Sequence, residues 1–98
     1  MADAKEMESL DSEALERVKK AFFDKDGNLR SLPSKQSKKQ GVLQVVVHTF
    51  EKDVHYTEKE INDRLKVIYA DFATLRRTLI DFGFLNRTAD GKTYWREK

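Results

Sequence analysis

The part of this chain that most restricts its fold is the last third, residues 71–96. Apolar side chains recur there at the spacing of one helix face, at Phe72, Leu75, Leu79 and Phe82. Gly83 follows as the left-handed residue that ends many helices, and Asp90-Gly91 is a strong hairpin turn signal. The threonine, tyrosine and tryptophan within residues 92–96 have high strand propensity. The segment therefore predicts an amphipathic helix followed by a two-stranded hairpin.

The clearest helix start in the chain is the sequence T-E-K-E from Thr57 to Glu60. It is a capping box, in which the Thr57 hydroxyl accepts from the Glu60 amide and the Glu60 carboxylate accepts from the Thr57 amide. Tyr56 and Ile61 occupy the two positions of a hydrophobic staple. The apolar stripe of this helix runs through Ile61, Leu65 and Ile68. The next helix is expected to start at Asp71, a good N-cap residue.

The first helix of the chain is expected to begin near Asp11 or Ser12, either of which could cap it. Its apolar stripe is Leu15, Val18 and Phe22. It should end at the sequence D-K-D-G-N, where glycine after aspartate favours a tight turn. This turn resembles part of a calcium-binding loop, but two required ligand positions would fall on Phe22 and Pro33, which supply no side-chain oxygen. The sequence thus predicts a turn and no calcium site.

A further helix is expected after Pro33, capped near Ser34 or Ser37. The apolar residues that follow are Val42, Leu43, Val46, Val47 and Phe50. Valine favours strands by propensity, whereas this spacing favours a helix. We give more weight to the spacing and predict a helix.

The expected order is helix, turn, three helices and hairpin. This order predicts a mainly α fold with a small β-hairpin, in the α+β class, arranged as a winged helix-turn-helix with an extra N-terminal helix. Residues 1–28 would form an N-terminal tail, helix and turn that pack on a winged-helix-like domain of residues 29–98. The stripe of the first helix covers either the flank of this domain or a second copy in a homodimer.

Composition excludes several classes of function. The chain has 98 residues and no cysteine, which excludes disulfides and cysteine-ligated metals. We find no apolar run of about 18 residues and no secretion signal at the start, so we expect a cytoplasmic protein without a membrane partner. His48 and His55 lack the paired spacing of metal ligands. No catalytic motif is present, so we expect no enzyme, metal or cofactor.

The charge of the chain is unevenly distributed. The formal net charge is +2, and residues 1–26 carry eight acids and five bases. Residues 27–98 carry nine acids and fourteen bases. A moderately basic body suits an anionic partner such as duplex DNA.

Residues 29–96 resemble a known prokaryotic family, the domain of unknown function 2087. The matching motifs are Leu32-Pro33, Tyr56–Glu60, Asp71–Arg77, Gly83–Arg87 and Tyr94–Arg96. This family occurs in bacterial transcriptional regulators, sometimes behind a helix-turn-helix domain of the ArsR type, and also as small free-standing proteins. The resemblance implies a role related to transcription, with no established biochemical activity. About 28 preceding residues cannot hold an ArsR-type domain.

The fourth expected helix would carry the DNA-reading residues. Its apolar stripe leaves Thr74 and Arg77 on the far side, where the planar guanidinium of Arg77 can bind phosphate or a guanine edge. Arg76 lies at the border of the stripe, so it contacts either DNA or an acid such as Asp71. Asp81 would repel phosphate but lies late in the helix, away from the usual contact end.

Basic residues elsewhere complete the candidate DNA-binding set. Arg87, Lys92 and Arg96 lie in the expected hairpin, where they would contact backbone phosphates. Lys38 and Lys39, near Lys35 at the start of the second helix, either meet phosphate or only solubilise the helix end. Tyr94 and Trp95 alternate along a strand, so one should pack inward and the other outward.

Two functions fit these observations. The first is a DNA-binding bacterial transcriptional regulator of winged-helix type. The second is a protein-interaction or effector-sensing domain with the same fold and no DNA binding. A continuous basic face would indicate the first function. A basic set that is scattered, or neutralised by Glu58, Asp63 and Asp81, would indicate the second.

Overall fold

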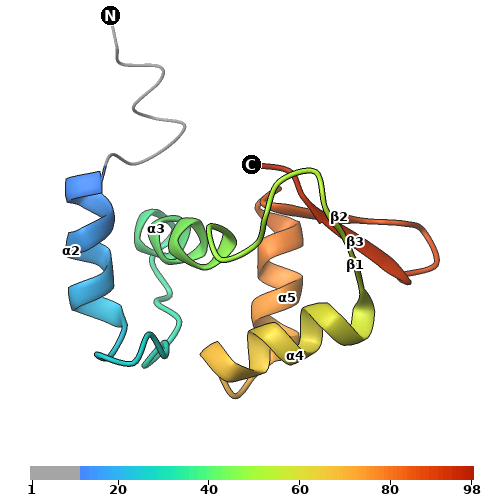
Figure 1. The fold of residues 1–98 in the computed structure, drawn as a ribbon. Coiled ribbons are helices and arrows are strands. Elements are labelled where there is room, and N and C mark those ends of the chain that lie inside the picture. The colour runs from blue at the N-terminus through green and yellow to red at the C-terminus, as the bar shows by residue number, and fades with distance from the viewer. Residues whose placement is uncertain (1–11) are drawn as a thin grey trace, which may run out of the picture.

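The computed structural model describes residues 12–98, which form four helices and one three-stranded antiparallel sheet (Figure 1). The helices are α2 (Ser12–Phe22), α3 (Gln36–Val47), α4 (Glu58–Ile68) and α5 (Phe72–Asp81). The strands are β1 (His55–Thr57), β2 (Leu85–Arg87) and β3 (Thr93–Arg96). The expected α+β class is confirmed. Asp11 lies outside the described residues, so its predicted role as a cap does too.

The sheet has the order β1-β3-β2, with β3 in the centre. The hairpin of β2 and β3 is confirmed, and Leu85 pairs with Arg96 in its register. The sequence did not predict β1, which has only three residues and pairs Tyr56 with Tyr94 of β3. Three residues are too few to show the alternation that predicts a strand from sequence. The extended conformation of β1 comes from its pairing with β3. Tyr94 packs inward and Trp95 is partly exposed, as the alternation predicted.

Helices α4 and α5 begin where the sequence places them, and α5 also ends there. The Glu60 amide donates to the Thr57 hydroxyl at 3.1 Å, and the Thr57 amide donates to the Glu60 carboxylate at 2.8 Å. Asp71 caps α5 by accepting from the Thr74 amide at 3.4 Å. Gly83 has a φ of 78° and follows the C-cap of α5. These confirmed caps fix where α4 and α5 begin and where α5 ends.

The end of α5 has the two hydrogen bonds of a Schellman motif. The Gly83 amide donates to the Ile80 carbonyl at 3.0 Å, and the Phe84 amide donates to the Leu79 carbonyl at 2.9 Å. Phe84 is then buried as the chain enters β2. The hairpin therefore leaves α5 in a fixed direction.

The start of α3 differs from the prediction. The N-cap is Lys35, which makes no capping hydrogen bond through its side chain, so neither Ser34 nor Ser37 caps the helix. Packing explains why α3 is nevertheless stable, since most of its second half is buried. Its buried residues are Gly41, Val42, Leu43, Gln44, Val46 and Val47. The choice of helix over strand is confirmed, although α3 ends at Val47 and the buried Phe50 lies in the turn after it.

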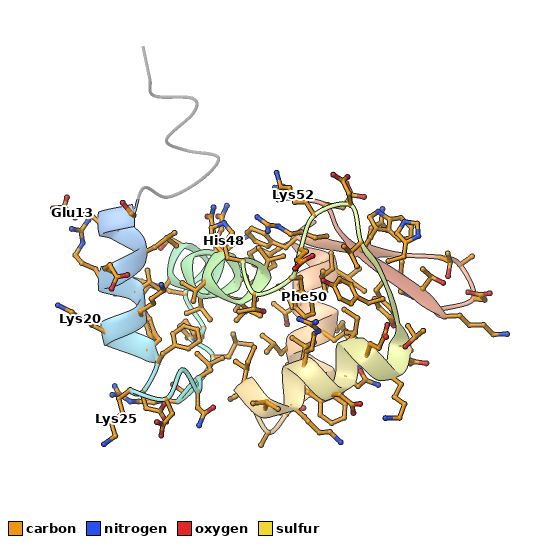
Figure 2. All side chains as sticks on the ribbon, in the orientation of Figure 1. Glu13, Lys20, Lys25, His48, Phe50 and Lys52 are labelled. Carbon is orange, nitrogen blue, oxygen red and sulfur yellow. The ribbon has the colours of Figure 1, made fainter. Side chains whose placement is uncertain are left out.

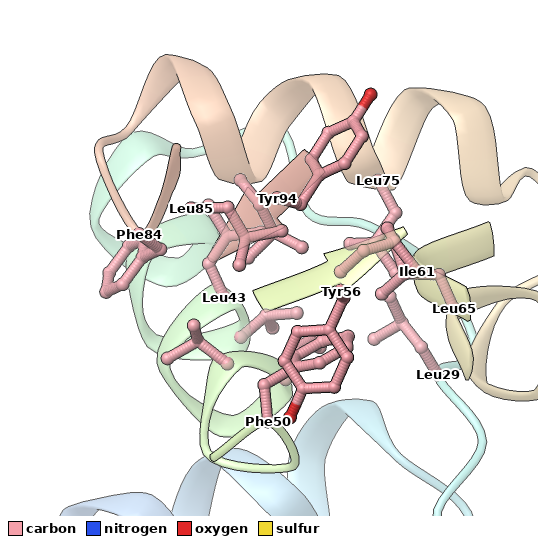
Figure 3. Close-up of a cluster of buried hydrophobic side chains, with 14 of the residues drawn as sticks. Leu29, Leu43, Phe50, Tyr56, Ile61, Leu65, Leu75, Phe84, Leu85 and Tyr94 are labelled. Atoms are coloured by element: carbon pink, nitrogen blue, oxygen red, sulfur yellow. The ribbon is translucent and has the colours of Figure 1, made fainter. Parts of the chain in front are cut away.

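One hydrophobic core joins α3, α4, α5 and the sheet (Figure 3). Its fully buried members include Leu43, Phe50, Ile61, Leu65, Leu75, Leu79 and Phe84. Phe72 and Phe82, at the two ends of the expected α5 stripe, are only partly buried. The centre of α5 is thus anchored more firmly than its ends.

Helix α2 lies at one edge of the molecule and packs against α3 (Figure 1). None of its residues is fully buried, but Val18 and Phe22 pack against the core. The turn after α2 is confirmed: the Asp24 carboxylate accepts from the amides of Asp26 and Asn28, each at 2.9 Å. Within residues 12–98, no helix is long and apolar enough to cross a membrane.

Candidate nucleic-acid interface

Helix α5 has one buried side and one exposed side. Leu75 and Leu79 are completely buried, while Thr74 and Arg77 are exposed. The Thr78 hydroxyl donates to the Thr74 carbonyl at 2.7 Å and so covers the backbone of the helix there. The structure therefore places Thr74 and Arg77 on the outer side of the helix that the sequence indicated.

A hollow of about 360 Å³ lies between α5, the start of α4 and the β2–β3 hairpin. We call it the α5–hairpin hollow. Its lining residues are Glu58, Arg76, Arg77, Ile80, Asp81, Arg87, Asp90, Gly91 and Tyr94. Three arginines thus come together from α5 and the hairpin, and three acids share the hollow with them.

Arg76 is held by α4. Its Nη1 donates to the Oδ1 of Asn62 at 2.5 Å and lies 3.9 Å from the Glu58 carboxylate. The acid that Arg76 contacts is Glu58 rather than Asp71, and contact of Arg76 with DNA stays a prediction. The sequence had named Glu58 as an acid that could neutralise the basic set, but Asn62 was not predicted. Their contact with Arg76 depends on how α4 crosses α5, which the sequence pattern of either helix does not contain.

Arg77 and Arg87 are the exposed arginines of the hollow. Arg77 comes from the outer side of α5 and Arg87 from the end of β2. Arg87 lies against the hairpin turn, since a Cβ added to Gly91 would be 3.1 Å from its Nη1. Gly91 also has a φ of 73°, so this position needs glycine for its conformation.

The tip of the hairpin is held by Asp90. Its carboxylate accepts from the Thr88 hydroxyl at 2.6 Å and from the Lys92 amide at 3.0 Å. The hydrogen bond from Thr88, followed by that from the Lys92 amide, lowers the pKa of Asp90 below its ordinary value. Asp90 is therefore charged at neutral pH and lines the same hollow as Arg87, while the Lys92 side chain is exposed.

Arg96, a predicted DNA contact, makes hydrogen bonds to backbone carbonyls of the protein itself. Its guanidinium donates to the Phe50 carbonyl at 2.9 Å and to the Lys98 carbonyl at 3.3 Å. Its Nε is buried without a hydrogen-bond partner among residues 12–98. Strand alternation could have indicated this position, because residues 94 and 96 share one face of β3 and Tyr94 packs inward.

Lys38 and Lys39 do not join the α5–hairpin hollow. They lie in the first turn of α3, and Lys38 lines a shallow hollow that α3 forms with α2. In Figure 1, α2 and the start of α3 lie at the left of the molecule and the hairpin lies at the right. The predicted basic set is therefore divided between two parts of the molecule.

Trp95 and His55 face the outer side of the sheet, with ring centroids 5.4 Å apart. The Trp95 indole donates to the Glu97 carboxylate at 2.8 Å, and the side-chain amide of Asn86 donates to the same oxygen at 3.1 Å. The hydrogen bond from Asn86, followed by that from Trp95, lowers the pKa of Glu97. Asn86, Trp95 and Glu97 are therefore hydrogen-bonded to one another, and none of them lines the α5–hairpin hollow.

The arginines of the hollow are the side chains there that could bind an anion. A guanidinium fork can bond to two oxygens of a phosphate, or to the O6 and N7 of guanine. Among residues 12–98, no group of three His, Asp or Glu side chains is arranged to hold a metal ion.

Comparison with known families gives one match. The model of a family described as "Uncharacterized protein conserved in bacteria (DUF2087)" matches residues 28–96. The chain belongs to this family, as the motifs in its sequence indicated. Searches of curated proteins and of solved structures give no match.

Proposed function

We propose that this member of the family is a DNA-binding domain of winged-helix type that acts in bacterial transcription regulation. In this proposal α4 and α5 form the helix-turn-helix, α5 lies in the major groove, and the β2–β3 hairpin is the wing beside it. The protein would act in the cytoplasm, where bacterial DNA lies.

The arrangement of elements supports this proposal. The chain order is α3, β1, α4, α5, β2, β3, and the sheet order is β1-β3-β2. A helix pair whose second member leads directly into a hairpin is the arrangement that a winged helix needs. The buried side chains that the two helices share in the core, and the hydrogen bond from Arg76 to Asn62, hold this pair together.

The observation that carries the proposal is the position of Arg77 and Arg87. Both are exposed, and both line the α5–hairpin hollow although they are ten positions apart and in different elements. Arg77 belongs to the part of α5 that would face base edges, together with the exposed Thr74. Arg87, with Lys92, would contact phosphates beside the groove.

The acids of the hollow limit the strength of this binding. Glu58 is close to Arg76, but Asp81 and Asp90 oppose the charge of Arg77 and Arg87. We therefore expect weak binding to random sequence, with affinity that depends on base contacts by α5. Because Lys38 and Lys39 lie outside the α5–hairpin hollow, they would add no phosphate contacts there, and the number of such contacts would be small.

A second function, a protein-interaction or effector-sensing domain without DNA binding, is favoured by the same acids. The basic residues do not form one continuous face, and this was the arrangement expected for the second function. A partner protein whose surface carries charges of both signs could bind to Arg77 and Arg87 and to the acids near them.

Binding to duplex DNA at several salt concentrations separates the two functions. Arg87→Ala should weaken binding to all sequences and reduce the slope of log affinity against log salt by about one unit. Arg30→Ala is the matched control, because Arg30 is exposed in the loop after the turn and lies outside the hollow. Absence of binding at low salt, with folded protein, would contradict the DNA proposal and leave the second function.

The oligomeric state is a separate part of the proposal. Two copies related by a two-fold axis could place their α5 helices on half-sites about one helical turn apart. Sedimentation of the chain with and without duplex DNA tests this arrangement. A strict monomer in both conditions would exclude the dimer and leave α2 as a brace on α3.

A further inference from the structure

A second and larger pocket, of about 470 Å³, lies away from the α5–hairpin hollow. It is formed by α2, the turn at residues 24–28, the end of α3 and the end of α4. We call it the N-terminal pocket. Its apolar lining is Leu15, Phe23, Val45, Val46 and Ile68. Its volume is in the range of small-molecule sites, which are typically 300–1,000 Å³.

The floor of the N-terminal pocket is fixed by the core. Phe23 and Val46 are 6% and 1% exposed, and the other apolar lining residues are partly buried. The Leu29 amide donates to the Ile68 carbonyl at 2.8 Å and so ties the turn to the end of α4. The pocket is therefore formed before any ligand binds.

The mouth of the pocket is positively charged. Lys19, Lys25 and His48 line the pocket from α2, the turn and the end of α3, and all three are exposed. Figure 2 labels Lys25 in the turn and His48 at the end of α3. Asp24 is the acid among the described lining residues, and its Oδ1 already accepts from two backbone amides of its own turn. The salt bridge of Lys19 with Glu16, 3.4 Å long, is solvent-exposed and worth little, so Lys19 is available to a ligand.

The electrostatics of His48 agree with a cationic mouth. Burial lowers the pKa of His48, and the next contributions come from Arg96, Lys19 and Lys52, all of them cations. A neutral imidazole at this position can donate a hydrogen bond to a carboxylate, and the surrounding cations favour a negative ligand.

We infer that the N-terminal pocket binds a small carboxylate with an apolar chain, such as a medium-chain fatty acid. The chain would lie on Phe23, Val45 and Val46, and the carboxylate would lie at the mouth near Lys19 and His48. An uncharged apolar ligand would fill the floor but leave the cations at the mouth without a partner. This inference does not rest on DNA binding, because it concerns different elements and a different ligand.

Titration of the ¹⁵N-labelled chain with octanoate tests the inference. We expect saturable shifts of amide signals in the turn at residues 24–28 and at residues 45–49, with one ligand per chain. Octan-1-ol has the same chain without the charge and should bind several-fold more weakly. Acetate has the charge without the chain and should cause no saturable shift. Octan-1-ol binding as tightly as octanoate, or octanoate shifts centred outside this pocket, would overturn the inference.

Two charge reversals on α2 provide a matched pair. Lys19 lines the pocket, whereas Lys20 is exposed on the same helix and points away from α3 (Figure 2). Lys19→Glu should weaken octanoate binding about five-fold or more, since two charges 4 Å apart in water interact by about 1 kcal/mol. Lys20→Glu changes the net charge equally and should leave the affinity nearly unchanged. Equal effects of the two changes would contradict a site at Lys19.

Discussion

The two ends of the molecule expose different kinds of surface. The α5–hairpin hollow has three arginines and three acids among its nine lining residues. The N-terminal pocket has an apolar floor, with the cations Lys19 and Lys25 at its mouth. In the proposed function the first surface would bind an extended polyanion that charged groups position, and the second would bind a small ligand that loses water from an apolar chain.

The two surfaces also differ in how the fold builds them. The first is held by local devices, which are the capping box of α4, the Asp71 cap, the Schellman motif at Gly83 and the Asp90 hydrogen bonds. The second depends on the packing of α2 against α3 and on the link from Leu29 to Ile68. A change in one surface should therefore leave the other largely intact.

The largest effect on stability is expected beneath α5. Leu75→Ala should lower the free energy of unfolding by about 2–5 kcal/mol, because Leu75 is completely buried and its truncation leaves a cavity. Val67→Ala is the control, since Val67 is 72% exposed. Urea denaturation measures both variants. A Leu75→Ala protein as stable as the parent would contradict the assigned orientation of α5 and the exposure of Arg77.

A smaller effect is expected on specific DNA affinity. Arg77→Ala should cost about 1–3 kcal/mol on a preferred duplex if Arg77 bonds to a base edge. Arg76→Ala should change this affinity less, because Arg76 is held by Asn62 and Glu58. Competition binding against random duplex gives both values. A greater loss from Arg76→Ala than from Arg77→Ala would reverse the roles proposed for these neighbours.

The cap of α4 should contribute less again. Thr57→Ala removes the hydroxyl that accepts from the Glu60 amide and should destabilise the chain by about 1 kcal/mol. Thr57→Ser keeps a capping hydroxyl and serves as the control. Thermal unfolding compares the three proteins. Equal stability of the alanine and serine variants would show that the capping box contributes little to this fold.

The sequence-based predictions were correct where a short local motif determines the structure. The capping box at Thr57, the cap at Asp71 and the stop at Gly83 were predictable because each is a local motif with its own geometry. The burial of Tyr94 followed from strand alternation. The helix over Val42–Val47 followed from spacing, although valine alone favours strands.

The failures involve contacts between distant residues. β1 exists through its pairing with β3, and α3 starts without a serine cap because packing stabilises it. Arg76 meets Asn62 fourteen positions away, and Arg96 meets Phe50 forty-six positions away. The N-terminal pocket was not predicted at all, since its lining comes from α2, a turn, α3 and α4.

The smallest predicted effect is a pH dependence of the stability of the chain, which comes from His48 in the N-terminal pocket. Burial and three nearby cations lower the pKa of His48 below its ordinary 6.5, so the unfolded chain takes up this proton more readily. The contribution of His48 to stability is therefore complete above the ordinary pKa and falls as the pH drops toward the folded pKa. His48→Gln should flatten the decline in stability below about pH 6.5. Identical pH profiles for parent and variant would contradict this account.

The most direct test of the two-surface account is one ¹⁵N-labelled sample titrated separately with duplex DNA and with octanoate. The account predicts that DNA shifts amide signals of α5 and of residues 87–92. Octanoate should shift residues 24–28 and 45–49, leaving the α5 signals in place. Shifts by DNA confined to Lys35–Lys39 and α2, or shifts by both ligands at one common set of amides, would contradict the account.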